Sequence, residues 1–321
     1  MNTLAVLTAG GDAPGMNACV RAVVRAALGR GGRVMCVRRA FEGLAAGEYG
    51  ELGPRDVGGI IQRGGTILQT VRFPQFAEPQ VQAQAVARLK ENGVEGLVVI
   101  GGDGSMRGAL ALHRHGFPVI GVPASIDNDI PGTDLALGVD TALNTIVEAI
   151  DKLRDTASSH RRAFIVETMG RHCGYLALTA GIVCGAETVL IPEQPASVAE
   201  VAAAVQDAFA RGKTHAIIVV AEGASIGGAA LKGELDALRL GFSFRVTILG
   251  HTQRGGSPSA LDRLLAARFG VAAVERLLGG ERGAMVGLQG REIAAVPLET
   301  AGSGVRPPEL DYVRMARMLA K

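Results

Sequence analysis

The sequence is poor in aromatic side chains and has no excess of charge of either sign. Tryptophan is absent and aromatic residues make up 4% of the 321 residues, so a core must be built mainly from aliphatic and small side chains. Hydrophobic residues are nonetheless 48% and charged residues only 20%, which excludes an intrinsically disordered chain. Thirty-three Lys and Arg against 31 Asp and Glu give a net charge of +2, without the strong basic bias of nucleic-acid-binding proteins.

Long hydrophobic runs and paired cysteine motifs are also lacking. The longest stretch without a charged residue has 15 residues, from His172 to Ala186, and is shorter than the roughly 18 that suggest a membrane-spanning helix. The four cysteines form no CxxC pair, no Asn-x-Ser/Thr sequon occurs, and the N-terminal residues do not resemble a secretory leader. We therefore expect a reduced, cytoplasmic protein.

Glycine is abundant, with 45 residues, and two kinds of segment alternate along the chain. Short apolar runs are typical of strands buried on both faces, and longer stretches repeat apolar residues every 3.6 positions, as helices do. This alternation predicts an α/β fold with a largely parallel sheet. The expected strands are residues 4–7, 34–37, 97–100, 119–122, 164–166, 188–191 and 216–220. The expected helices are residues 16–28, 81–90, 106–114, 142–156, 198–210, 261–278 and 310–319.

Two of the expected strands run directly into glycine-rich turns that precede a helix. Residues 97–105 read LVVIGGDGS, and residues 10–17 read GGDAPGMN. Backbone N–H groups in such turns, together with a helix N-terminus, favour phosphate oxygens. The carboxylate of Asp103 is placed to hold Mg²⁺ on the same phosphates. Neither turn matches GxGxxG or a Walker motif. An ordinary strand-to-helix turn, capped by Ser105 in the first case, is the alternative.

An acidic segment follows the expected strand 119–122. Residues 123–134, PASIDNDIPGTD, carry three carboxylates within eight positions, which repel one another unless a metal or cation is near. The alternation of an extended chain places Asp127 and Asp129 on the same side. One could bind Mg²⁺ while the other takes a proton from an attacking hydroxyl. The alternative is an Asx-rich surface turn.

Several cationic residues occur in apolar or glycine-rich settings near strand ends. Guanidinium groups match phosphate oxygens in pairs and can stabilise a phosphoryl group in transfer. The candidates are Arg72, Arg171, Arg245, His251 and Arg254. Arg21 and Arg25, in contrast, lie one turn apart on the polar face of an expected helix, a pattern typical of a solvated surface.

Taken together, these motifs resemble those of the bacterial ATP-dependent 6-phosphofructokinase family. The resemblance is carried, in chain order, by GGDAPGMN at 10–17, GGDGS at 101–105, IDND at 126–129, MGR at 169–171 and GHTQRGGSP at 250–258. It implies two doubly wound, Rossmann-like α/β lobes that share chain segments, with the active site in the cleft. The implied ATP-binding lobe comprises residues 1–138 and 252–304, and the implied fructose-6-phosphate-binding lobe comprises residues 139–251 and 305–321.

The resemblance implies transfer of the γ-phosphoryl group of MgATP to the 1-hydroxyl of D-fructose 6-phosphate, the committed step of glycolysis. It implies Asp127 as general base, with Arg171 and Arg72 stabilising the moving phosphoryl group, and Mg²⁺ near Asp103 and Asp129. The implied ATP-binding residues are Gly11, Arg72, Phe73, Gly102, Asp103, Gly104 and Ser105. The implied sugar-phosphate-binding residues are Ser125, Ile126, Asp127, Arg162, Met169, Gly170, Arg171, Glu222, Arg245, His251 and Arg254.

The family resemblance also implies allosteric regulation and a homotetramer. It changes the interpretation of Arg21 and Arg25, because they match a subunit-interface site that binds ADP or phosphoenolpyruvate. The implied effector-binding residues are Arg21, Arg25, Arg154, Gly185, Glu187, Arg211, Lys213 and His215. Arg162 would reach the active site of a neighbouring subunit. Neither a nucleic acid nor a membrane is expected as a partner.

Two other functions stay open at the level of sequence. Diphosphate-using relatives commonly carry Asp at the position of Gly104 and Lys at that of Ala124, so these two small residues favour ATP. A catalytically silent nucleotide-binding regulator on the same fold is disfavoured because Asp103, Asp127 and Arg171 are intact.

Overall fold

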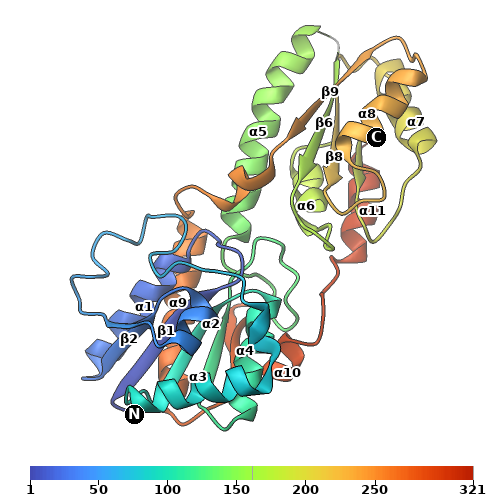
Figure 1. Cartoon of the computed structure of the whole chain (residues 1–321). Helices are drawn as coiled ribbons and strands as arrows, with labels where there is room; N and C mark the ends of the chain where they lie inside the picture. Colours follow the sequence, from blue (N-terminus) through green and yellow to red (C-terminus); the bar gives the residue numbers. More distant parts are fainter. Residues whose placement is uncertain (161, 321) are drawn as a thin grey trace. The chain divides into compact units, whose positions relative to one another are not determined.

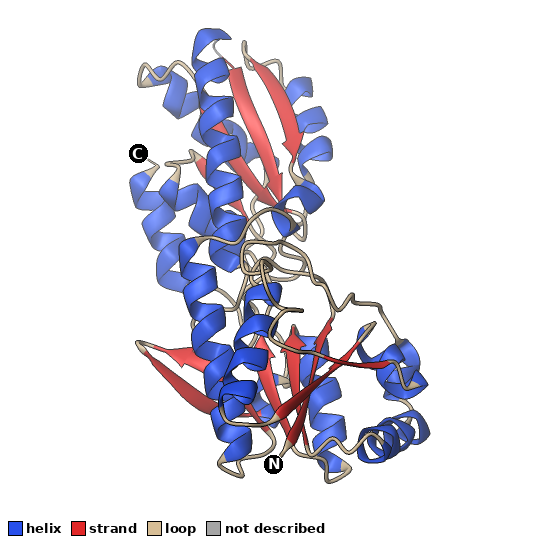
Figure 2. Ribbon diagram, turned by 90° about the vertical axis from the view of Figure 1, so that its left-hand side faces the viewer, coloured by secondary structure: helices blue, strands red, loops and turns tan. Residues whose placement is uncertain are grey.

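A computed structural model describes residues 1–160 and 162–320, which divide into two compact units (Figure 1). Unit 1 comprises residues 1–126, 130–141 and 254–305. Unit 2 comprises the described parts of 127–129, 142–253 and 306–321. In each unit helices flank a sheet made wholly or mainly of parallel strands (Figure 2), which confirms the expected α/β fold class.

Unit 1 is built on a seven-stranded sheet with the order β11-β10-β5-β4-β1-β2-β3. Its strands are β1 (Thr3–Ala9), β2 (Arg33–Val37), β3 (Tyr49–Glu51), β4 (Gly96–Gly101), β5 (Val119–Pro123), β10 (Ala284–Gln289) and β11 (Glu292–Pro297). The strands β10, β5, β4, β1 and β2 run parallel, and the two outermost strands are antiparallel to their neighbours. Every residue of β4 is buried, because a parallel sheet has helices on both faces.

The helices of unit 1 pack closely through small residues. They are α1 (Met16–Gly29), α2 (Ala40–Ala46), η1 (Pro74–Ala77), α3 (Pro79–Glu91), α4 (Asp103–Arg114), α9 (Ala260–Leu278) and α10 (Leu298–Ala301). Helix α1 contacts α9, and a Cβ at Gly270 of α9 would lie 2.6 Å from the Ala22 methyl group of α1. Gly270 therefore sets how near the two helices approach.

The N-terminus of the long helix α5 (Val139–His160) is held by the fully buried Asp262 of α9. Its two carboxylate oxygens accept hydrogen bonds from the backbone N–H groups of Gly138 and Thr141, each at 2.9 Å. Burial raises the pKa of Asp262, and these hydrogen bonds oppose that rise. A carboxylate at this position satisfies free N–H groups at a helix start, so Asp262 fixes where α5 begins.

Unit 2 is built on a four-stranded, fully parallel sheet with the order β7-β8-β6-β9. Its strands are β6 (Arg162–Thr168), β7 (Thr188–Leu190), β8 (Ala216–Ala221) and β9 (Ser243–Ile248). Its helices, besides the continuation of α5, are α6 (Tyr175–Val183), α7 (Val198–Ala210), α8 (Gly228–Ala237), η2 (Gly250–Arg254) and α11 (Leu310–Leu319). The last residue of η2, Arg254, belongs to unit 1. Alternate residues of β8, Ala216, Ile218 and Val220, share one core cluster with Leu231 of α8 and Phe244 of β9, as the two-residue period of a strand requires.

All seven expected strands and all seven expected helices are present, with ends shifted by a few residues. Strands β3, β9, β10 and β11 and helices α2, α6, α8 and α10 were not predicted. Helix α6, YLALTAGIV, is apolar on nearly every side and lacks the 3.6-residue pattern. Strand β9 is a half-exposed edge strand with an arginine at its centre. Within the described residues, no helix is both long and apolar enough to cross a membrane.

The four cysteines are all buried and unbridged. Cys19 and Cys36 lie in unit 1, and Cys173 and Cys184 lie in unit 2. Burial raises the pKa of every one of these thiols, that of Cys173 to about 12 and that of Cys184 to about 11. The thiols are therefore protonated at neutral pH.

Candidate active site

Three segments singled out in the sequence follow three adjacent strands of unit 1. In the register of the sheet, Ala9 of β1 pairs with Gly101 of β4, and Gly101 pairs with Pro123 of β5. The turns that start at Gly10, Gly102 and Ala124 therefore lie side by side. This carboxyl edge of a parallel sheet is where ligands bind in doubly wound folds.

The first two turns touch through glycines and the buried side chain of Ser105. Gly10 has a left-handed φ of +82°, and a Cβ there would lie 3.2 Å from Ser105 Oγ. A Cβ at Gly101 would overlap Ser105. Helix α4 begins at Asp103, with Gly102 as the N-cap residue and no side-chain cap. Ser105 is thus within the helix, and its proposed role as the cap is wrong.

Gly104, in contrast, is not explained by packing within the protein. A Cβ at this position would meet only the guanidinium of Arg107, at an ordinary contact distance of 3.6 Å. Its φ is not in the left-handed region. Glycine inside a helix costs about 1 kcal/mol relative to alanine. Its presence in the exposed first turn of α4 is therefore best explained by a need for open space above the turn.

Asp103 offers a carboxylate at this edge. It forms an ion pair with Arg107 (Oδ2 to Nη1, 2.8 Å), and its side chain is 29% exposed. The residues that the structure describes contain no cluster of three or more His, Cys, Asp or Glu suited to a metal. Magnesium bound with a nucleotide needs only one or two carboxylates besides phosphate oxygens, so a reachable carboxylate such as Asp103 fits that ion.

Residues from two other parts of unit 1 reach the first glycine turn. Arg254 donates a hydrogen bond from Nη1 to the Asp12 carbonyl oxygen (3.1 Å), and its guanidinium lies against Gly11. Thr70 Oγ1 donates to the Gly10 carbonyl oxygen (2.7 Å), which brings the segment that carries Arg72 and Phe73 close to the turn. The Arg72 side chain is exposed. The structure therefore brings the Gly11 turn, Arg254 and the 70–73 segment together.

In unit 2, a strained turn follows β6. Arg171 has a left-handed φ of +49°, and its backbone N–H donates to Glu222 Oε1 (2.9 Å). The N–H of Glu222 donates to the Thr168 carbonyl oxygen (2.8 Å). A Cβ at Gly223 would overlap the Arg171 carbonyl oxygen. The turn containing Met169, Gly170 and Arg171 is thus fixed by the residues that follow β8.

A residue not singled out in the sequence, Gln253, joins this turn to η2. Its side chain is fully buried; Oε1 accepts from the Met169 N–H (3.3 Å), and Nε2 donates to the Gly250 carbonyl oxygen (3.0 Å). The amide thereby links the 169–171 turn to the turn that carries His251. The only sequence signal was a polar amide within a glycine-rich motif, and such a signal does not reveal burial.

Asp127 and Asp129 belong to unit 2 and are nearly buried, with 5% and 9% of their surface exposed. The Asp129 carbonyl oxygen accepts a hydrogen bond from the Arg306 N–H (2.7 Å). The burial of these two carboxylates argues against the interpretation as an Asx-rich surface turn, because the side chains of such a turn are exposed. Ser125 and Ile126 end the third turn of unit 1, and the Ser125 N–H donates to the Leu137 carbonyl oxygen (3.1 Å).

Arg162 and Arg245 lie apart from the other sugar-phosphate candidates of unit 2. Arg162 begins β6, and Arg245 on β9 pairs with Phe164 two residues later. The 169–171 turn follows the opposite end of β6. At a rise of about 3.3 Å per residue, the two ends of β6 are separated by about 20 Å. One copy of unit 2 therefore does not bring these arginines to its own 169–171 turn.

Most of the effector candidates of unit 2 cluster around the buried carboxylate of Glu187. Lys213 Nζ donates to Glu187 Oε1 (2.7 Å), and the Arg154 guanidinium donates to the Cys184 carbonyl oxygen beside Gly185. Burial lowers the pKa of His215, as do the neighbouring Arg154 and Lys213, while Glu187 opposes them. Three basic side chains thus gather in one place.

The remaining effector candidates lie elsewhere. Arg211 pairs with Asp207 (2.9 Å) on α7. Arg21 and Arg25 lie on α1 in unit 1, where Arg25 Nη2 donates to the Pro54 carbonyl oxygen (3.0 Å). A single chain therefore shows two basic groups, one in each unit.

Comparison with known proteins gives consistent results. A family model described as phosphofructokinase matches residues 3–277. The chain is 51% identical to the ATP-dependent 6-phosphofructokinase 1 of Thermus thermophilus over the full length of both proteins. It is 53% identical to the ATP-dependent 6-phosphofructokinase of Lysinibacillus sphaericus over 91% of each protein.

Solved structures share the fold. A T-state phosphofructokinase from Pichia pastoris superposes with a TM-score of 0.90 at 37% identity, covering 94% of this chain and 35% of the longer yeast chain. A pyrophosphate-dependent phosphofructokinase from Marinobacter aquaeolei superposes with a TM-score of 0.87 at 21% identity, covering 100% of this chain and 91% of the other.

Proposed function

The chain belongs to the phosphofructokinase family and catalyses the ATP-dependent 6-phosphofructokinase reaction, and from this premise we propose which of its residues perform the transfer. The single observation that carries the proposal is the shared edge of unit 1, where three turns follow β1, β4 and β5 side by side. We propose that this edge binds ATP, and that unit 2 binds fructose 6-phosphate around the 169–171 turn.

Gly104 supports ATP rather than diphosphate as the phosphoryl donor. Among residues 1–160 and 162–320 no contact requires a glycine there, and a side chain would project from the exposed start of α4. An acidic side chain at this point would repel the α-phosphate of a nucleotide. We infer that the open space above Gly104 accommodates that phosphate.

A donor assay tests this choice. With fructose 6-phosphate and Mg²⁺ present, turnover with ATP should exceed turnover with diphosphate by at least about 100-fold. ATP fills the proposed α-phosphate subsite and diphosphate leaves it empty, and such a difference is worth several kcal/mol. Gly104→Asp should depress the ATP reaction, with Ala111→Asp, on the same helix, as the control. Equal use of both donors by the unchanged protein would contradict the proposal.

The transfer itself needs positioning and charge more than covalent chemistry. We propose that Asp127 takes the proton from the 1-hydroxyl as this oxygen attacks the γ-phosphoryl group. Arg171 and Arg72 then stabilise the negative charge on the phosphoryl group between donor and acceptor. The left-handed turn at Arg171 and its hydrogen bond to Glu222 hold that residue in one orientation before substrate arrives.

The family requires a divalent metal, and we propose Mg²⁺ with Asp103 as its principal protein ligand. Asp129, nearly buried and two residues from Asp127, would be a second carboxylate for the same ion. When bound, the ion neutralises charge on the donor phosphates. The exposed ion pair between Asp103 and Arg107 is weak enough to be released for this purpose.

We propose that Arg162 and Arg245 serve the sugar-phosphate site of a neighbouring subunit. Both lie at the end of their sheet that is opposite to the 169–171 turn, and β9 is an edge strand. A homotetramer, expected from the family resemblance, would supply such neighbours. We also propose that the protein acts in the cytoplasm, in keeping with its glycolytic role.

We further propose a regulatory site for ADP or phosphoenolpyruvate, formed by the Glu187 cluster of one subunit and Arg21 and Arg25 of another. The two basic groups lie in different units, and an anion would replace the present partners of Lys213 and Arg25, which are Glu187 and the Pro54 carbonyl oxygen. Below the lowered pKa of His215 the imidazolium would add to this positive charge.

Replacing Arg25 tests the regulatory site. Arg25→Ala should raise the ADP concentration needed for half-maximal effect at least tenfold, because a guanidinium–phosphate pair is lost. Arg30→Ala, an exposed arginine one turn further along that pairs with Glu275, is the matched control. Effector titrations of initial rate measure both. If Arg25→Ala and the unchanged protein respond equally, Arg25 has no part in the site.

A further inference from the structure

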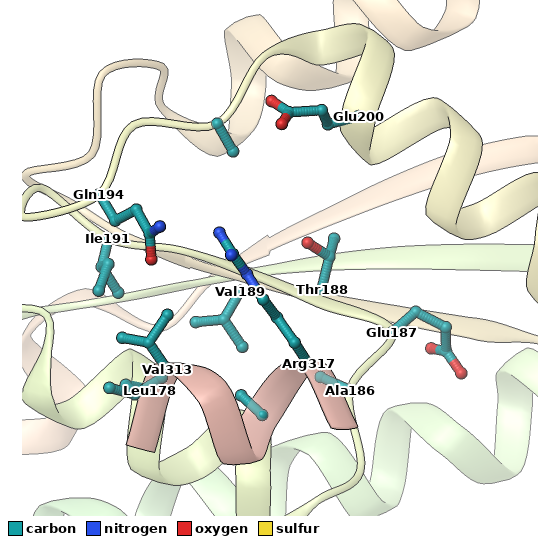
Figure 3. A pocket seen from close by; sticks show the side chains of 12 residues that line it. Leu178, Ala186, Glu187, Thr188, Val189, Ile191, Gln194, Glu200, Val313 and Arg317 are labelled. Atoms are coloured by element: carbon teal, nitrogen blue, oxygen red, sulfur yellow. The ribbon is translucent and has the colours of Figure 1, made fainter. Parts of the chain in front are cut away.

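Unit 2 contains a pocket that shares only Glu187 with the sites above. Its volume is about 220 Å³, and it lies between β7, the start of α7, the C-terminal helix α11 and helix α6 (Figure 3). The side chains of Leu178, Val189, Ile191 and Val313, together with three alanines, form an apolar wall. An engineered apolar cavity of about 150 Å³ takes up benzene, so this pocket has room for a molecule of roughly nine non-hydrogen atoms.

The polar side chains of Thr188, Gln194 and Arg317 converge on this apolar wall. Figure 3 shows Arg317 extending from α11 between Gln194 and Thr188. Across residues 1–160 and 162–320, no hydrogen bond or ion pair engages the side chain of any of the three. A mostly apolar pocket with a few convergent polar groups is the usual form of a small-molecule site.

The charges around the pocket favour a singly charged anion over a doubly charged one. The guanidinium of Arg317 can pair with both oxygens of a carboxylate. The two carboxylates of the wall are already engaged: Glu200 accepts from the Ser197 N–H (2.7 Å) and hydroxyl (2.8 Å), and Glu187 accepts from Lys213 Nζ (2.7 Å). Glu200 also interacts electrostatically with Arg317. The two negative groups beside this one guanidinium would repel a phosphate dianion more strongly than a carboxylate.

We propose that this pocket binds a small amphipathic monocarboxylate, with its carboxylate on Arg317 and its carbon chain against Val189, Ile191 and Val313. Thr188 and Gln194 lie on either side of the guanidinium and can each donate a hydrogen bond to the same carboxylate or to a neighbouring oxygen. The pocket is lined entirely by unit 2 and contains none of the residues assigned to phosphoryl transfer. The proposal is therefore independent of the catalytic assignments.

Ligand-observed NMR with the full-length protein tests the proposal with defined probes. 4-Methylpentanoate, which has eight non-hydrogen atoms, should bind with a dissociation constant on the order of 1 mM. Its uncharged analogue 4-methylpentanamide and inorganic phosphate should each bind at least about tenfold more weakly. Arg317→Gln should weaken 4-methylpentanoate binding by a similar factor. Ala316→Leu, which fills the apolar part, should abolish it.

Arg314→Gln is the matched control, because Arg314 lies on the same helix, is exposed and faces Asp311 rather than the pocket. It should bind 4-methylpentanoate as the unchanged protein does. Equal binding by Arg317→Gln and Arg314→Gln, or preference for phosphate over the carboxylate, would overturn the proposal. So would the absence of carboxylate binding in a protein that is active with ATP.

Discussion

Asp127→Ser is expected to lower kcat by about 10²–10⁴-fold, the usual contribution of a positioned general base. The 1-hydroxyl of a sugar is a poor nucleophile while it keeps its proton, and a serine hydroxyl does not accept that proton at neutral pH. Asp127 is only 5% exposed, so bulk water has little access to replace it. The KM values for ATP and fructose 6-phosphate should change much less than kcat, because the lost interaction belongs to the transition state.

Asp134→Ser provides the matched control for this experiment. Asp134 lies in the same acidic segment but is exposed, and its Oδ2 accepts a hydrogen bond from the Gly290 N–H (2.7 Å) at the surface. Its replacement should leave kcat within about threefold, since surface substitutions away from a site have small effects. Steady-state kinetics of both variants decide the matter. Near-normal kcat in Asp127→Ser would falsify the assignment of the base.

Gly223→Ala is expected to reduce kcat about 100-fold, although residue 223 carries no reactive group. Its Cβ would overlap the Arg171 carbonyl oxygen, so the 169–171 turn must move. Residue 223 does not have a left-handed φ, and the steric conflict alone therefore causes the effect. A displacement of about 1 Å in a catalytic group can cost 10²-fold in rate. The KM for fructose 6-phosphate should also rise, because Glu222 and Met169 move with the turn.

Gly233→Ala separates this effect from a general intolerance of alanine. Gly233 lies within α8 of the same unit, and a Cβ there would meet nothing within 4 Å. Alanine should keep full activity there and raise stability by about 0.5–1 kcal/mol, because it favours the helix. Kinetics and urea unfolding of both variants give the comparison. A fully active Gly223→Ala protein would show that Arg171 need not be held in this position.

The sequence was most informative where local chemistry determines local structure. Continuous apolar runs predicted the strands β1, β4 and β5, and these strands are adjacent, so the turns that follow them lie at one edge of the sheet. Sequence pattern could not predict α6, whose surface is apolar on almost every side, nor the edge strand β9, whose arginine interrupts the apolar pattern. Both depend on tertiary surroundings rather than on periodicity.

The sequence indicated candidate residues one by one, but it did not predict which of them lie together in the fold. Arg254 and Gly11 are more than 240 positions apart in the sequence, and only the fold brings the guanidinium to the turn. The family resemblance implies both Arg245 and Glu222 as sugar-phosphate-binding residues, yet Arg245 lies toward the end of the sheet opposite to the turn that Glu222 contacts. The role of Gln253 depends on complete burial of its amide, a property that its residue type does not disclose.

The four buried cysteines can be used to measure local opening of the structure. A thiol-reactive reagent needs an accessible thiolate, and these thiols are 0–4% exposed with raised pKa values. Modification will therefore wait for an opening motion, and its rate measures how often that motion occurs. Because two thiols lie in each unit, mass spectrometry of the modified peptides would report the opening of each unit separately. Adding a ligand for one unit should slow modification there first.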